Sequence, residues 1–95
     1  MIGNERRSAM KITLKDQVYI VKWKHPVNEE GQRVTECSIK DENSGIYGLG
    51  TAVCSKKEQF VKDKGRKISL ARAFKSQKVF KKNDRKAFWD EYFAM

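Results

Sequence analysis

The sequence has few of the residues on which catalytic and metal sites most often depend. Its 95 residues include one histidine, His25, and two cysteines, Cys37 and Cys54. A Ser-His-Asp arrangement would have to use His25, which stands directly before a proline and is typical of a strand end or a turn. The two cysteines are too few and too far apart in sequence for a metal knuckle. We therefore expect no metal site and no cofactor.

Carboxylate pairs with a catalytic spacing are absent from the sequence as well. Asp41-Glu42 falls in a predicted turn, and Asp90-Glu91 falls on the solvent side of a predicted helix. Neither pair is spaced for two-metal or acid/base chemistry. We predict that the protein is not an enzyme.

Long apolar segments are also missing. No run approaches the roughly 20 residues that a transmembrane helix needs, and the N-terminus lacks the apolar region of a secretory signal. In a reducing compartment, isolated cysteines are usually small buried hydrophobes, which we expect of Cys37 and Cys54, although facing strands would allow them to pair. These absences predict a soluble protein of the cytoplasm.

Positive charge, by contrast, is abundant and unevenly distributed. The chain holds 21 Lys and Arg against 12 Asp and Glu, a formal net charge of +9. The stretch from Ser55 to Lys86 carries ten Lys and three Arg against three acidic residues, a net +10, so the rest of the chain sums to −1. Segregated positive charge attracts polyanions, whereas an ordinary lysine-rich helix only keeps a protein soluble.

We predict that this basic stretch binds the phosphates of DNA or RNA, with weak sequence preference. The predicted contacts are all of its cations: Lys56, Lys57, Lys62, Lys64, Arg66, Lys67, Arg72, Lys75, Lys78, Lys81, Lys82, Arg85 and Lys86.

For three of these cations, the neighbouring residues give a specific reason to expect phosphate binding. If Gly65 ends one helix, Arg66 and Lys67 lie in the first turn of the next, where free amides attract an anion. Alternatively, one helix runs through Gly65, and the argument for an anion site at Arg66 and Lys67 then disappears. Glycine inside that helix would cost about 1 kcal/mol relative to alanine. Arg72 stands between Ala71 and Ala73 and should be accessible to a phosphate, unless it pairs with a nearby acidic side chain.

Before the basic stretch, the sequence alternates with the period of strands. The strongest candidate is 17–24, which is apolar on both faces and so predicts a central strand covered on one side by helix. A short edge strand over 11–15, strands over 33–40 and 46–54, and turns at 28–31 and 41–45 complete an antiparallel meander. Gly48 and Gly50 indicate a bulge or the close approach of another backbone.

From Ser55 onward the period becomes helical. Ser55 and Glu58 form a capping box that predicts a helix over 56–64. A second helical run reaches about Lys78, and Asn83 can cap a last helix over 84–93.

Aromatic residues on the strands and on the last helix allow two interpretations. We expect them to be core, because a small sheet must bury large side chains against its helices. Exposed rings on the sheet would instead stack on single-stranded nucleic acid, and an exposed stripe on the last helix would mark a protein partner or a homodimer contact. The residues concerned are Tyr19, Trp23, Tyr47, Phe88, Trp89, Tyr92 and Phe93.

The patterns together predict one α+β domain over residues 1–95. We expect a three- or four-stranded antiparallel β-meander followed by two or three C-terminal α-helices packed on one face. Residues 1–9 should form a flexible tail, 10–54 the sheet and 55–95 the basic helical region.

The C-terminal half also resembles a group of known proteins. It is similar to small, mostly uncharacterised proteins encoded by bacteriophages. The resemblance is carried by the following residues, in this order: Cys54-Ser55, Phe60, residues 64–74, Arg85 and residues 89–92. The resemblance assigns a role to no individual position. It implies an accessory protein in a bacterial cytoplasm that either binds nucleic acid or inhibits a host or anti-phage enzyme. An inhibitor would dock its basic helical face on an acidic or nucleic-acid-binding host protein.

Overall fold

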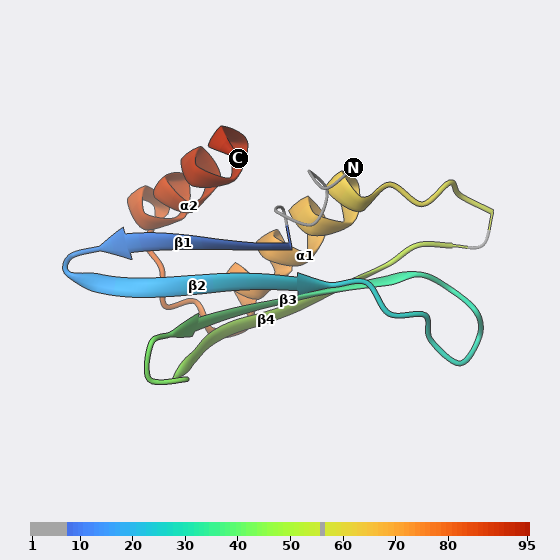
Figure 1. The fold of residues 1–95 in the computed structure, drawn as a ribbon, viewed down its shortest axis with the longest axis horizontal. Coiled ribbons are helices and arrows are strands. Elements are labelled where there is room, and N and C mark those ends of the chain that lie inside the picture. Colours follow the sequence, from blue (N-terminus) through green and yellow to red (C-terminus); the bar gives the residue numbers. More distant parts are fainter. Residues whose placement is uncertain (1–7, 56) are drawn as a thin grey trace.

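The computed structural model describes residues 8–55 and 57–95. Its elements, in chain order, are β1 (Ala9–Leu14), β2 (Gln17–Lys24), β3 (Val34–Asp41), β4 (Ile46–Val53), α1 (Lys62–Gln77) and α2 (Lys82–Ala94). The strands form one antiparallel sheet in the order β1-β2-β3-β4, and both helices lie on one side of it (Figure 1). The predicted α+β class, the meander and the one-sided helix layer are confirmed. Residues 1–7 of the predicted tail lie outside the described part of the chain.

Tight turns set the register of the meander. Lys15 and Asp16 join β1 to β2, and both have positive φ, 51° and 67°, as a two-residue hairpin turn requires. In the turn before β4, the Asp41 carboxylate accepts hydrogen bonds from the N–H groups of Asn43 and Gly45 at 2.9 and 2.8 Å. These bonds hold the pKa of Asp41 below its usual range, with the Gly45 N–H as the largest cause.

Glycines allow α1 to lie directly on β4. A Cβ on Gly50 would collide with the carbonyl oxygen of Ser69, and a Cβ on Gly48 with that of Ala73. The register with β3 also shifts after Ile39, so the strand contains an irregularity as well. The close approach of another backbone and the strand irregularity, which Gly48 and Gly50 indicated as alternatives, are therefore both present.

Of the two alternatives at Gly65, the structure has the helix that continues through it. Gly65 lies inside α1, and its N–H donates to the Val61 carbonyl oxygen at 3.1 Å. A side chain at this position would collide with Thr35 of β3. Glycine is needed here for close helix–sheet packing, which outweighs its weak helix propensity.

The predicted helix start is wrong. Ser55 and Glu58 interact as a capping box would, with the Ser55 N–H donating to the Glu58 carboxylate at 3.3 Å, but they close a turn. Phe60 packs edge-on against His25, with 5.7 Å between ring centroids, and lies under the Arg33 guanidinium. These contacts tie this segment to the β2–β3 connection, so the helix begins only at Lys62. Lys56, where the predicted helix began, lies outside the described residues.

The core fills the space between the sheet and the helices. Trp23, Leu70 and Phe88 are buried there, and Tyr19 packs edge-on with Tyr47 at 5.1 Å between ring centroids. The core interpretation of the aromatic residues is therefore confirmed, except that Phe93 is 65% exposed.

The two cysteines are free thiols and do not pair. Cys37 is a buried core residue, as expected, and burial raises the pKa of its thiol to about 12. Cys54 is half-buried.

Candidate nucleic-acid interface

The predicted phosphate contacts occupy three different environments. Arg66 is buried, and Lys67 and Arg85 are half-buried. Lys56 lies outside the described residues. The other nine predicted contacts are exposed: Lys57, Lys62, Lys64, Arg72, Lys75, Lys78, Lys81, Lys82 and Lys86.

Arg66 belongs to the packing between the two helices and not to the surface. It is 5% exposed, and its Nε donates to the Tyr92 hydroxyl of α2 at 3.1 Å. The Tyr92 hydroxyl donates in turn to the Asp63 carboxylate, and Trp23 donates to the Arg66 carbonyl oxygen at 3.2 Å. We call the set Asp63, Arg66, Lys67 and Tyr92 the helix seam. The burial of Arg66 removes it from the candidate phosphate contacts.

Lys67 is also engaged in the helix seam, although it stays half-exposed. Its ammonium lies 2.9 Å from the Asp63 carboxylate and 5.4 Å from the centre of the Phe93 ring. The Tyr92 hydroxyl first, and then Lys67, lower the pKa of Asp63. Burial first, and then Asp63, raise the pKa of Tyr92. Because Arg66 is buried and Lys67 is paired with Asp63, the sharpest site predicted from the sequence is not an open anion site.

Arg72 and Ser76 close the outer edge of the sheet. Arg72 donates from Nη1 to the Thr51 carbonyl oxygen at 2.7 Å, and Ser76 accepts from the Leu49 N–H at 3.1 Å. These bonds satisfy the Thr51 carbonyl oxygen and the Leu49 N–H of β4. Left free, such groups at a sheet edge can pair with another strand. Arg72 remains exposed, but it is held at the sheet edge.

A groove lies between the C-terminal half of α1 and the beginning of α2. We call it the helix groove; it encloses about 430 Å³ and is lined by Ala71, Phe74, Lys75, Lys78, Phe80, Arg85 and Trp89. Three of the predicted cations therefore converge around an apolar, aromatic floor. Arg85 is fixed in place because its Nη1 donates to the Phe80 carbonyl oxygen at 2.7 Å.

In the part of the chain that the structure describes, the cations at the helix groove have no acidic partner. Within residues 8–55 and 57–95, no carboxylate lies within ion-pair distance of Lys75, Lys78 or Arg85. Lys75 and Lys78 stand at the C-terminal end of α1, where the helix dipole favours a cation even without a ligand. Lys82 and Arg85 stand in the first turns of α2, where the dipole disfavours a cation. Asp84 in the same turn offsets part of this charge. Arg85 is held by the Phe80 carbonyl oxygen, so Lys82 is the cation of this pair that helix stability does not explain.

A stacked aromatic pair runs from the helix groove toward the C-terminal end of α2; Trp89 is half-buried and lines the groove, and Phe93 is exposed. The rings of Trp89 and Phe93 stack at 6.1 Å between centroids with 26° between their planes. Lys86 lies on the outer side of the same helix and pairs with Asp90 at 2.9 Å, but both side chains are exposed, so the pair is weak. An exposed ring, Phe93, and an exposed cation, Lys86, are therefore both present on α2.

The strands also carry exposed cations, which were not among the phosphate contacts predicted for the stretch from Ser55 to Lys86. Lys11, Lys22, Lys24 and Lys40 are exposed, and strand alternation directs them away from the helices. The period-two spacing of Lys22 and Lys24 was a visible signal for this arrangement. It was missed because acidic residues balance these lysines along the sequence, whereas on this face of the sheet Glu36 is opposed by four lysines.

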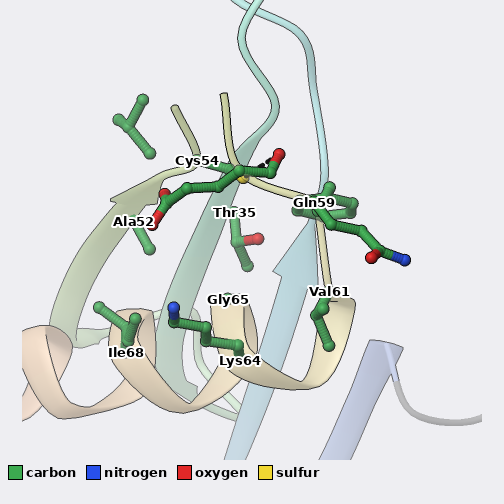
Figure 2. A pocket seen from close by; sticks show the side chains of 11 residues that line it. Thr35, Ala52, Cys54, Gln59, Val61, Lys64, Gly65 and Ile68 are labelled. Carbon is green, nitrogen blue, oxygen red and sulfur yellow. Dashed lines mark hydrogen bonds between the residues drawn. The ribbon is translucent and has the colours of Figure 1, made fainter. Parts of the chain in front are cut away.

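A second, smaller pocket lies where β4 meets the first turns of α1. Figure 2 shows Lys64 and Ile68 on the helix below Cys54 and Gln59. The cavity is about 70 Å³, well below the roughly 300–1,000 Å³ of typical ligand sites. We regard it as a packing gap under the segment that precedes α1.

His25 lies near the same end of the molecule. Its Nδ1 is 3.0 Å from the Thr35 hydroxyl. Burial first, and then the nearby charges of Arg66, Lys62 and Arg33, lower the pKa of His25.

Comparisons of the chain with protein-family models, with curated proteins and with solved structures found no match. The resemblance to phage-encoded proteins therefore stays a prediction. Among the described residues, no helix has both the length and the apolar character that crossing a membrane requires.

Proposed function

We propose that the protein binds single-stranded nucleic acid without catalysing a reaction. The observation that carries this proposal is the helix groove, where Lys75, Lys78 and Arg85 surround an aromatic floor next to the stacked Trp89 and Phe93. Cations that follow a phosphate backbone, combined with rings on which bases stack, are the two elements of single-strand binding. The phosphate contacts that we now propose are Lys64, Lys75, Lys78, Lys81, Lys82, Arg85 and Lys86.

The proposal is tested by titrating labelled single-stranded DNA, single-stranded RNA and duplex DNA at about 50 and 200 mM salt. In the variant Lys75→Ala with Lys78→Ala and Arg85→Ala, binding should weaken at low salt. The slope of log affinity against log salt should become shallower by about 2, at roughly 0.7 per lost single-strand phosphate contact. Undetectable binding of all three probes to the parent at low salt would refute the proposal.

A matched control variant changes three exposed cations that do not line the helix groove: Lys22→Ala with Lys24→Ala and Lys57→Ala. It carries the same net charge as the groove variant. If both variants lose affinity equally, the binding is a general effect of net charge and not a property of the groove.

The second candidate function is inhibition of a host or anti-phage protein in the bacterial cytoplasm. The exposed Phe93, near the C-terminal end of α2, favours a protein contact, with another protein or with a second copy of this chain. A pull-down from bacterial lysate, with and without nuclease, distinguishes the two functions. Partners that survive nuclease treatment favour inhibition, and partners that are lost favour nucleic-acid binding.

A further inference from the structure

The sheet has a second surface that neither helix covers (Figure 1). We call it the open sheet face and define it by Lys11, Ile20, Lys22, Lys24, Lys40 and Leu49. Exposed lysines and aliphatic side chains share this face, and Leu49 is 54% exposed. The strands also direct Glu36 toward it, so four lysines oppose one carboxylate, a net +3.

The strand register mixes cationic and apolar side chains closely. Ile20 is the direct cross-strand partner of both Lys11 and Lys40. Ser38 is the partner of both Lys22 and Leu49. Direct partners have their Cβ atoms about 5 Å apart. A shallow groove of about 440 Å³ crosses this region, with Lys22, Lys24, Lys40 and Leu49 among its lining residues.

This composition fits a protein better than a nucleic acid. The described aromatic residues of the strands, Tyr19, Trp23 and Tyr47, pack with the core on the helix side, so bases would find no stacking platform here. Exposed aliphatic side chains gain nothing from phosphate, but they gain from burial against other apolar groups. A second copy of the chain is disfavoured, because two faces of net +3 would meet.

We propose that the open sheet face docks an acidic amphipathic helix of a partner protein. The apolar stripe of that helix would pack on Ile20 and Leu49, as α1 and α2 pack on the other face of the sheet. Its flanking carboxylates would pair with Lys22 and Lys40, because Lys24 already lies opposite Glu36 in the strand register. The surface faces away from the helix groove, so the protein can hold a protein partner and a nucleic acid at the same time. The inference does not depend on nucleic-acid binding.

The test is an NMR titration of the ¹⁵N-labelled full chain with three defined probes. They are a synthetic helical peptide in which Glu flanks a stripe of Leu, an oligoglutamate of equal charge, and single-stranded DNA. The helical peptide should shift the amide signals of Lys22, Lys24 and Leu49, and should bind at least tenfold more tightly than oligoglutamate. Lys22→Glu with Lys40→Glu should weaken peptide binding at least tenfold. The matched control, Lys75→Glu with Lys78→Glu in the helix groove, should leave it unchanged.

Two further variants keep the outcome decisive. Leu49→Ser should weaken binding of the helical peptide and leave oligoglutamate binding unchanged. Lys22→Gln with Lys40→Gln should act in the same direction as the charge reversal, which covers the case in which the reversed variant unfolds. The proposal is overturned if the peptide shifts only helix-groove signals, if oligoglutamate binds equally well, or if DNA occupies the open sheet face as tightly as the peptide. Loss of DNA binding in the groove variant alone would bear on the proposed function and not on this inference.

Discussion

The two ends of the helix pair differ in how their cations are neutralised, although the sequence makes them look alike. In the helix seam, Arg66 is buried, and Asp63 lies near both Arg66 and Lys67. At the helix groove, Lys75, Lys78 and Arg85 stand among apolar residues without a carboxylate partner in the described chain. The seam therefore stabilises the fold, whereas the groove retains positive charge that a ligand can use. Charge density along the sequence does not separate these roles; the spatial neighbours of each cation do.

The largest expected effect follows from removing the buried cation of the seam. Arg66→Met should destabilise the protein by about 3 kcal/mol, because Tyr92 loses a buried hydrogen-bonded partner and Asp63 loses a nearby cation. Denaturant unfolding measures this loss. The matched change at the groove, Arg85→Met, should cost about 1 kcal/mol or less, the value of its single bond to a carbonyl oxygen. Equal losses in the two variants would contradict the distinction between seam and groove.

A second prediction concerns how closely α1 lies on the sheet at the seam end. Gly65→Ala should destabilise by about 2 kcal/mol, because the collision with Thr35 outweighs the better helix propensity of alanine. Ala71→Gly, at a half-buried position of the same helix, is the reference for propensity alone. A stabilised Gly65→Ala variant would show that the helix can move away from β3.

For the aromatic pair of α2, the expected effect is larger on binding than on stability. Phe93→Ala removes a ring that is 65% exposed and that contacts Trp89, Tyr92 and the Lys67 ammonium, so the free energy of unfolding should fall by about 1 kcal/mol or less. Binding of single-stranded DNA should weaken about tenfold, because one base loses its stacking partner. Duplex DNA, whose bases are already stacked, should bind with little change. An equal loss for both probes would assign Phe93 to a protein or dimer contact instead.

The sequence was sufficient for the sheet and insufficient for the seam, for physical reasons. Local alternation and turn residues define β2 and its neighbours, and these signals lie within a few residues of each other. The burial of Arg66 depends on Tyr92, 26 residues further along the chain, and no local pattern reports it. A glycine such as Gly65 is typical of a helix end. Here it is needed inside the helix because Thr35, on β3, leaves no room for a side chain. The cations of the groove were all identified, yet their convergence required the two helices to be placed.

The smallest expected effect concerns the pH dependence of stability near the seam end. The pKa of His25 is lowered from its ordinary value of 6.5, chiefly by burial and then by Arg66, Lys62 and Arg33. The unfolded chain therefore binds a proton that the folded chain resists, so stability should fall as the pH decreases through 6.5 toward the lower folded value. The melting temperature measured between pH 7.5 and 5.5 should show this decline, and His25→Gln should reduce it. Arg66→Met should also reduce it, because one of the charges that disfavour the imidazolium is gone. Asp63, whose pKa is lowered from 3.8, loses its stabilising contribution only at still lower pH, so it does not obscure this window. A decline that persists unchanged in His25→Gln would place its origin in another group.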